Sequence, residues 1–139
     1  MENKSSIVCG GARHIARFME ILYNVLCGNG ISAQAQIGEG TVFYHHGVGC
    51  VVHELCTIGE NCRIFSNVTI GCKWAENKKP GRPPRIGNNV MIGAGAVILG
   101  DISVGDNSIV GANAVVLDDV PENSMAVGVP AHIYMKQVK

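Results

Sequence analysis

The sequence predicts an all-β solenoid, in which short strands wind into a triangular, parallel β-helix of hexapeptide repeats. Three observations lead to this fold class. An aliphatic residue returns every six positions over most of residues 31–120, and a small or β-branched residue recurs four places after it. Only 5% of the residues are aromatic, whereas 18 of the 139 residues are glycine. An interior with few aromatic rings suits a narrow, repetitive core better than a broad one.

Each hexad is expected to form one side and one corner of the coil. The aliphatic residue points inward, the fifth residue fills the space beside the turn, and Gly, Asn or Asp provides the corner conformation. Coils hydrogen-bond to their neighbours, so the aliphatic residues stack into one core. A sandwich of short strands would instead need hairpin signals every ~8–12 residues. The hexads are 31–36, 37–42, 52–57, 58–63, 64–69, 86–91, 92–97, 98–103, 104–109 and 110–115.

The residues before the repeat have a different period. Apolar side chains recur at helical spacing and Gly28 provides a stop signal, which predicts a short amphipathic helix over residues 12–27. The chain therefore divides into an N-terminal helical cap, residues 1–30, and a solenoid with a C-terminal tail, residues 31–139. We expect the helix to cover the open end of the solenoid, because such ends need caps; binding of a partner is the less common role.

Two segments interrupt the repeat, and function tends to be found where a rigid scaffold is interrupted. Hexads counted forward from Ile37 and backward from Ile58 disagree by three residues, which predicts a bulge within residues 43–51. Residues 72–85 carry lysines, arginines and prolines, and are predicted to form one extruded loop. The loop either binds a substrate or an anionic cofactor, or is simply solvated.

Composition excludes several classes of function. Eleven basic and eleven acidic residues cancel, so neither a nucleic-acid partner nor a polybasic membrane surface is indicated. No apolar run approaches the ~20 residues that span a bilayer, and the start does not resemble a cleavable signal. The six cysteines form no CxxC pair, so we expect no disulfides and no zinc. Cys56 and Cys62 share the fifth hexad position and are predicted to be buried, free thiols. We expect a cytoplasmic protein.

An ordered series of motifs carries a family resemblance. The motifs are Ile37-Gly38-Glu39-Gly40, then 46–52 (HGVGCVV), 67–71 (NVTIG), 92–96 (IGAGA) and 127–131 (VGVPA). Over about residues 28–133 the sequence resembles the hexapeptide-repeat acyltransferases, in the serine acetyltransferase-like branch that includes small polysaccharide-type O-acetyltransferases. The resemblance implies a left-handed β-helix, a homotrimer, and acetyl-CoA bound between subunits. It also implies direct acetyl transfer to a hydroxyl, without an acyl-enzyme.

The resemblance places the general base at the bulge. An alcohol is a poor nucleophile at neutral pH, and histidine is the side chain whose ordinary pKa suits removal of its proton. Reading backward from Val51 and Val52 selects His46, whereas the hexad phase forward from Phe43 selects His45, which we favour slightly. His53 and Glu54 are expected to bind or orient the substrate.

The sequence departs from the family pattern at three places, two beside the base and one in the loop. Gly30 stands where serine acetyltransferases have an Asp that orients the base, and Tyr44 or His45 stands where an acidic residue precedes it. In the loop, Arg82 is kept as a substrate-binding residue, but Pro83 replaces a serine-binding His. The loss of this His favours a sugar or polysaccharide precursor as the acceptor, with serine as the alternative. A non-catalytic binding or assembly module is a further alternative, and a zinc-dependent γ-class carbonic anhydrase is disfavoured by the spacing of the histidines.

Four residues are expected, on the same resemblance, to contact acetyl-CoA as co-substrate: Gly71, Ala94, Ala112 and Lys136. Backbone N–H groups near the bulge or near Gly71 are candidates to stabilise the oxyanion. No metal is expected.

Overall fold

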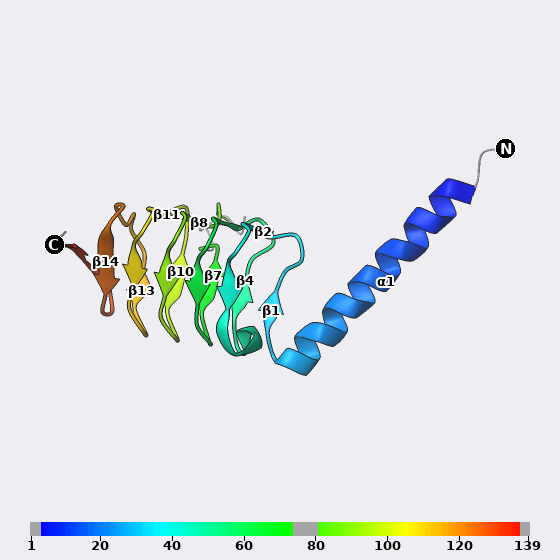
Figure 1. Ribbon diagram of the computed structural model, residues 1–139, viewed down its shortest axis with the longest axis horizontal. Helices are drawn as coiled ribbons and strands as arrows, with labels where there is room; N and C mark the ends of the chain where they lie inside the picture. Colours follow the sequence, from blue (N-terminus) through cyan, green and yellow to red (C-terminus); the bar gives the residue numbers. More distant parts are fainter. Residues whose placement is uncertain (1–3, 74–80, 137–139) are drawn as a thin grey trace.

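The computed structural model describes residues 4–73 and 81–136, with side chains described from residue 14 onward. A single helix, α1 (Lys4–Cys27), leads into a β solenoid whose coils stack along one axis (Figure 1). Each coil contributes one short strand to each of three parallel sheets, as the period of six predicts.

The three sheets form the three sides of the prism. Sheet A contains β1 (Gly30–Ile31), β4 (Val51–Val52), β7 (Thr69–Gly71), β10 (Val97–Leu99) and β13 (Val115–Val116). Sheet B contains β2 (Gln36–Ile37), β5 (Thr57–Ile58), β8 (Arg85–Ile86) and β11 (Ser103–Val104). Sheet C contains β3 (Val42–Phe43), β6 (Arg63–Ile64), β9 (Met91–Ile92), β12 (Ile109–Val110), β14 (Ser124–Val127) and β15 (His132–Met135).

The chain passes from sheet A to B to C and back to A, so the prism has three edges, which we call A–B, B–C and C–A. All sheet pairings are parallel between described strands except β14 with β15, which folds back antiparallel at the C-terminal end. A short 3-10 turn, η1 (Tyr44–Gly47), lies on the C–A edge between β3 and β4.

Strand registers locate both interruptions. A regular coil takes 18 residues, as between Arg85 and its partner Ser103. The coil that contains η1 takes 21 residues, from Gln36 to its partner Thr57, which confirms the three-residue bulge. The coil that contains the extruded loop takes 28 residues, from Thr57 to Arg85. Both insertions lie between consecutive strands, so the strands above and below them stay in register.

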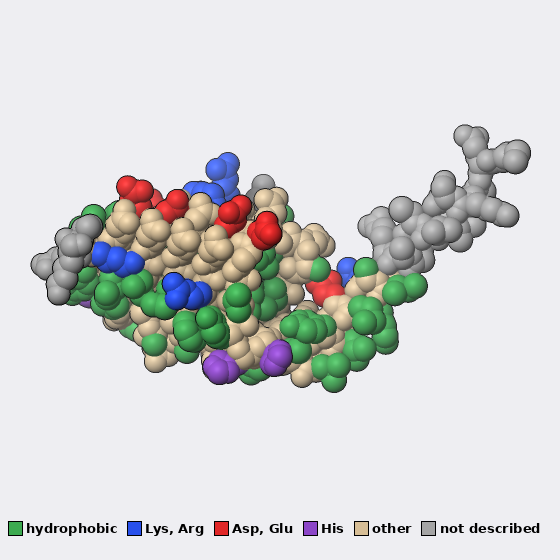
Figure 2. All heavy atoms as spheres, viewed as in Figure 1, with side chains coloured by type: hydrophobic (Ala, Val, Ile, Leu, Met, Phe, Trp, Pro, Cys, Tyr) green, Lys and Arg blue, Asp and Glu red, His purple; other side chains and the backbone are tan. Residues whose placement is uncertain are grey.

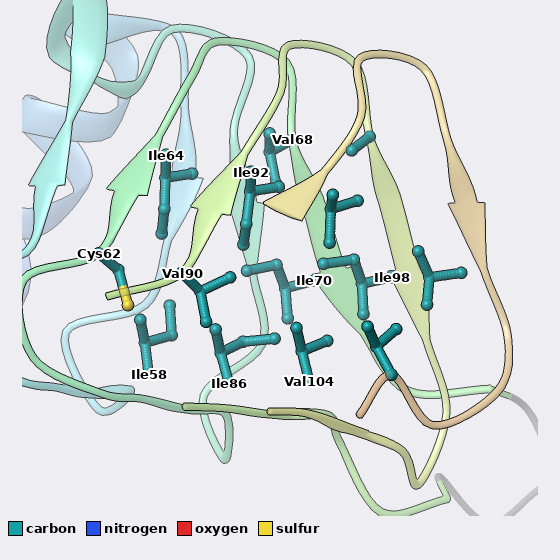
Figure 3. Packing of buried hydrophobic residues seen from close by; sticks show 14 of the residues in the cluster. Ile58, Cys62, Ile64, Val68, Ile70, Ile86, Val90, Ile92, Ile98 and Val104 are labelled. Atoms are coloured by element: carbon teal, nitrogen blue, oxygen red, sulfur yellow. The ribbon is translucent and has the colours of Figure 1, made fainter. Parts of the chain in front are cut away.

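Aliphatic side chains at position one of the hexads form the core (Figure 3). Ile64, Ile70, Ile92 and Ile98 have no solvent exposure. Ile92 stacks on Ile64 along sheet C, and Ile98 stacks on Ile70 along sheet A. The pattern weakens only at the first coil, where Ile37 is 39% exposed because no coil lies beyond it.

Three cysteines belong to this core. Cys50, Cys56 and Cys62 are fully buried, which confirms the predicted burial of Cys56 and Cys62. The Cys62 thiol donates a hydrogen bond to the Gly87 carbonyl oxygen at 3.1 Å, and burial raises the pKa of the Cys56 thiol to about 11. Cys27, Cys50, Cys56, Cys62 and Cys72 are free thiols, while the side chain of Cys9 lies outside the described part.

The helix differs from its prediction. It begins at Lys4 rather than at residue 12, because helical backbone hydrogen bonds continue beyond the segment whose apolar residues recur at helical spacing. Gly28 ends it, as predicted, with a left-handed φ of 60° and an Asn29 N–H bond to the Asn24 oxygen at 3.0 Å. Within the described residues, no helix is long and apolar enough to cross a membrane.

Instead of lying over the first coil, α1 projects away from the solenoid (Figure 1). Phe18 is 64% exposed and Leu26 is 76% exposed, and hydrophobic side chains cover the described surface of the helix (Figure 2). A side-chain hydrogen bond ties the described part of the helix to the first coil, where Glu20 Oε1 accepts from Ala33 N at 3.0 Å. In the single chain, the helix does not act as the predicted cap.

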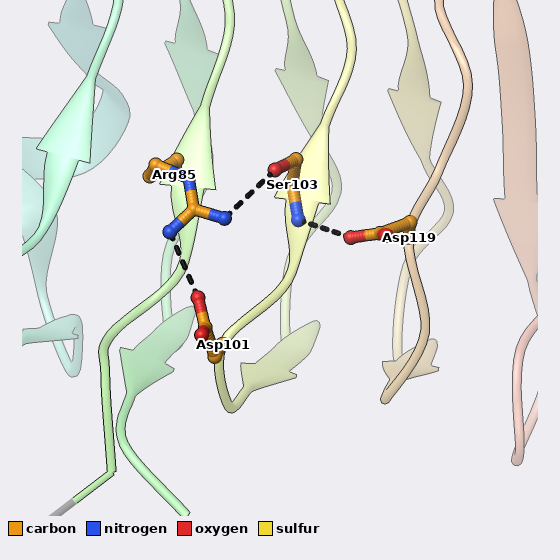
Figure 4. A network of polar contacts seen from close by, with 4 residues as sticks. All are labelled: Arg85, Asp101, Ser103 and Asp119. Atoms are coloured by element: carbon orange, nitrogen blue, oxygen red, sulfur yellow. Dashed lines mark hydrogen bonds and ion pairs between the residues drawn. The ribbon is translucent and has the colours of Figure 1, made fainter.

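The outer faces of the three sheets differ in polarity. Sheet B presents a polar network, in which Arg85 pairs with Asp101 at 2.8 Å and bonds Ser103 Oγ at 3.2 Å, while Asp119 accepts from Ser103 N at 2.7 Å (Figure 4). Both members of the ion pair are about half exposed, so the pair contributes little stability. Sheets A and C instead present mostly apolar side chains outward: Val51, Val97 and Val115 beside Thr69 on A, and Met91 and Ile109 beside Arg63 on C.

We expect Ile92→Ala to lower the free energy of unfolding by about 2–5 kcal/mol, because it leaves a cavity in a core that cannot collapse. Leu55→Ala is the matched control, since Leu55 is 65% exposed at a coil corner and Ile92 is fully buried. Urea unfolding followed by circular dichroism measures both. Equal losses in the two variants would contradict the inward assignment of the hexad position.

Candidate active site

The two histidines of the bulge lie side by side on η1. Both adopt left-handed backbone conformations, with φ of 54° at His45 and 58° at His46, which turn the chain sharply over the C–A edge. The turn is closed by hydrogen bonds from Val48 N to the His45 oxygen at 3.2 Å and from Cys50 N to the Gly47 oxygen at 2.9 Å. Both imidazoles are exposed, and Figure 2 shows histidine side chains on the surface near α1.

Glycines allow the turn to close. Gly47 has φ of 67° and is buried, and a Cβ placed there would lie 2.9 Å from Ile31 Cδ1. Gly49 has φ of 70°, and a Cβ there would lie 2.0 Å from Asn67 Oδ1. Local backbone geometry therefore explains the two glycines of the HGVG motif, since a side chain at either position would strain the turn.

Two contacts fix the position of the turn. The Tyr44 ring stacks on the Phe65 ring of the next coil, with centroids 4.8 Å apart and planes 8° apart. On the other side, Asn29 Nδ2 donates a hydrogen bond to the His46 carbonyl oxygen at 3.1 Å. The histidine turn is thus held between the residue that follows α1 and the second coil of the solenoid.

The histidines differ in what they face. A hollow of about 810 Å³ lies between α1 and the first coil, and His46 lines it together with Met19, Tyr23 and Phe43. His45 is not among its lining residues. This hollow gives a small molecule access to His46.

The structure brings two of the predicted cofactor residues together. Ala94 and Ala112 line one hollow of about 320 Å³, whose other walls are Phe65, Met91 and Ile109 with nearby backbone. The hollow is almost wholly apolar. A narrow apolar surface of this kind fits the aliphatic arm of coenzyme A better than its charged phosphates.

This hollow and the histidine turn lie on the same C–A edge. Backbone hydrogen bonds link successive coils there, from Asn67 N to the Val48 oxygen at 2.9 Å and from Gly95 N to the Ser66 oxygen at 3.0 Å. A third bond runs from Asn113 N to the Ala94 oxygen at 2.9 Å. With neighbouring strands about 4.8 Å apart, Ala94 lies roughly 10 Å along the edge from the turn.

The predicted substrate residues lie on a different edge. His53 and Glu54 follow β4 on the A–B edge, Gly71 ends β7 on that edge, and Arg82 is exposed just before β8. His53 Nδ1 accepts a hydrogen bond from Leu55 N at 3.2 Å, which occupies one ring nitrogen. The whole width of sheet A separates this group from His45 and His46 within one chain. Residues 74–80 of the predicted loop lie outside the described part.

Lys136 lies on the third edge of the prism. Its backbone N donates to the Asn123 oxygen at 2.9 Å and its Nζ donates to the Asn107 oxygen, both on the B–C edge. The four residues expected to contact acetyl-CoA therefore lie on three edges, and only Ala94 and Ala112 lie together. Among the described residues, no three His, Cys, Asp or Glu side chains cluster as metal ligands would.

Sequence reasoning missed three residues of this site: Asn29, Tyr44 as a stacking partner, and Phe65. Phe65 had a signal, since it is one of only three phenylalanines and stands outside the inward hexad positions. Asn29 had none, because its contact with His46 joins residues 17 apart in the sequence.

Comparison with known proteins agrees with this geometry. The family described as bacterial transferase hexapeptide (six repeats) matches residues 83–118. Serine acetyltransferase of Staphylococcus xylosus is 44% identical over 119 residues, which are 86% of this chain and 54% of that protein. The chain belongs to the hexapeptide-repeat family. Its solenoid is accordingly a left-handed β-helix of the acyltransferase branch.

The chain is also similar to solved structures of serine acetyltransferases. A truncated serine acetyltransferase apoenzyme superposes with a TM-score of 0.80 at 38% identity, covering 92% of this chain and 52% of that one. A serine acetyltransferase in complex with CoA superposes with a TM-score of 0.76 at 37% identity, covering 93% of this chain and 51% of that one. The chain thus spans about half the length of the relatives it matches.

We expect Gly47→Ala to lower the free energy of unfolding by about 1–2 kcal/mol, because alanine resists the left-handed conformation that this turn requires. Gly30→Ala is the control, since Gly30 has no left-handed φ and a Cβ placed on it would lie 3.8 Å from its nearest neighbour, Val51 Cγ2. Urea unfolding of both variants gives the comparison. A Gly47→Ala protein as stable as Gly30→Ala would argue against the closed turn.

Proposed function

We propose that this protein is an acetyl-CoA-dependent O-acetyltransferase, with its active site at the histidine turn on the C–A edge. One observation carries the proposal: the exposed histidines and the apolar Ala94–Ala112 hollow lie on the same edge of the prism, roughly 10 Å apart along it. The relatives, which are named serine acetyltransferases, support the same reaction class.

In the proposed reaction, an imidazole nitrogen takes the proton of the acceptor hydroxyl as the oxygen attacks the thioester carbonyl. The C–S bond then breaks, and the imidazolium returns the proton to the departing thiolate. No covalent bond to the protein forms. Backbone N–H groups near the turn are suited to stabilise the oxyanion, because they are fixed in place before the reaction.

His46 is the better candidate for the base. It lines the large hollow beside α1, through which an acceptor can approach, while His45 does not. Its carbonyl oxygen is also held by Asn29, which limits the positions available to its ring. This choice reverses our slight sequence-based preference for His45, which rested on hexad phase alone.

The substrate residues on the A–B edge can reach the histidine turn only from another subunit. Sheets A and C present apolar outer faces and sheet B a polar one, which supports burial of the first two in an assembly. We therefore propose a homotrimer in which His53, Glu54 and Arg82 of one subunit face the turn of its neighbour.

Serine is the acceptor that the relatives support best, and we propose it over the sugar acceptor expected from Pro83. The relatives that match most of this chain are named serine acetyltransferases, and one solved relative is described in complex with serine. Arg82 is exposed beside the loop and could pair with the carboxylate of an amino-acid acceptor.

The direct test is acetyl-CoA consumption with L-serine, simple sugars and nucleotide sugars. We expect serine to be the best acceptor, and His46→Ala to lower kcat by about 10²–10⁴-fold, the range typical of a lost general base. His14→Ala is the matched control on α1, and His45→Ala should have the smaller effect. Full activity in both His45→Ala and His46→Ala would contradict the site, and a sugar that outcompetes serine would contradict the acceptor.

Binding of CoA tests the apolar hollow separately. We expect Ala112→Trp, which fills the hollow, to raise the Kd for CoA at least tenfold, or about 1.4 kcal/mol. Glu122→Trp is the control, because Glu122 is exposed on the B–C edge. Isothermal titration measures both. A wild-type protein that does not bind CoA would favour the non-catalytic module.

A further inference from the structure

Asn29 occupies a junction between three parts of the molecule. It follows the helix-ending Gly28, precedes β1, and lies beneath the histidine turn, where its Nδ2 donates to the His46 oxygen at 3.1 Å. A Cβ placed on Gly47 would lie 3.6 Å from the same Nδ2 atom, so the amide lies against the turn itself. The bond to the carbonyl also fixes which end of the amide is nitrogen.

The other end of this amide has no partner in the described part of the chain. Asn29 Oδ1 is buried and accepts no hydrogen bond from any described donor. A buried acceptor without a donor is uncommon in native proteins and needs an explanation. Because the two amide heteroatoms are close together, Oδ1 lies within about 5 Å of the His46 carbonyl oxygen.

A histidine base needs such an acceptor. One ring nitrogen must keep its proton, held by a hydrogen bond, so that the other nitrogen is free to take a proton. Within this chain the position that resembles the family's orienting Asp is Gly30, which has no side chain. The adjacent residue, Asn29, offers a free amide oxygen at the same turn.

We propose that Asn29 is the positioning residue of the active site, holding the His46 turn through Nδ2 and the His46 ring through Oδ1. The ring nitrogen nearer the backbone, Nδ1, donates to Oδ1, and Nε2 is left free as the base. The inference rests on the proposed function for its role in catalysis, whereas the tautomer of His46 can be measured in a protein that shows no activity.

A neutral amide differs from a carboxylate in one respect. It selects the tautomer of the imidazole without favouring the imidazolium, whereas a carboxylate would raise the pKa of the histidine. Other titratable groups lie near the turn: Glu20 and Tyr23 on α1 line the same hollow as His46, Tyr44 and His45 belong to the turn, and Cys50 follows it. Of these, Glu20 already accepts from Ala33 N.

Long-range ¹H–¹⁵N NMR of the imidazole rings in the full chain tests the inference. In wild type we expect His46 to carry its proton on Nδ1, the minor tautomer of free imidazole side chains, and in Asn29→Ala to revert to Nε2. Asn24→Ala is the matched control, because the Asn24 side chain makes no hydrogen bond within the described residues. The Nε2 tautomer in wild type would overturn the proposal.

Asn29→Asp separates ring positioning from support of the turn. Aspartate loses the donor to the His46 oxygen but keeps the acceptor, so we expect it to retain the Nδ1 tautomer. It should also move the rising limb of the kcat/KM profile to higher pH, because a neighbouring carboxylate favours the imidazolium and the base must be unprotonated. Loss of the Nδ1 tautomer in both variants would reduce Asn29 to a structural residue. A wild-type Nδ1 tautomer without acetyl transfer would refute the proposed function alone.

Discussion

Inward stacking of aliphatic side chains at every sixth position is the constraint on which the rest of the structure depends. The coils on either side bury Ile64, Ile70, Ile92 and Ile98 completely. Each coil therefore shields the apolar side chains of its neighbours from water and is shielded by them. Parallel hydrogen bonds between coils hold the register that makes this stacking possible. Residues on successive coils are therefore spaced regularly along each edge of the prism. A site assembled from several coils requires such fixed spacing.

Insertions are tolerated because they leave the prism at its edges. Three extra residues at η1 and ten extra residues at the extruded loop both return the chain to the same register. The two insertions lie on different edges, C–A and A–B, which places the histidines and the loop residues apart in one chain. A trimer would therefore complete the site as well as bury the apolar faces of sheets A and C.

The first coil is where the repeat has no neighbour to cover it. Ile37 is exposed there, α1 projects away, and the hollow beside His46 opens between them. The same absence of regular packing leaves Asn29 free to contact the histidine turn rather than a neighbouring coil. The irregular end of the solenoid is thus also where we propose the active site, as is common where a rigid scaffold is interrupted.

The sequence alone determined the solenoid, its hexad register, the inward residues, the three-residue bulge and the buried cysteines, because these follow from a local period that every coil repeats. Together with the family resemblance, it also limited the candidates for the proposed base to His45 and His46. Only the tertiary structure decided that Ala94 and Ala112 share a hollow, that Lys136 lies on another edge, and that Asn29 holds the His46 turn. These relations depend on which edge of the prism each residue occupies, and on contacts between residues distant in sequence, which a six-residue period does not encode.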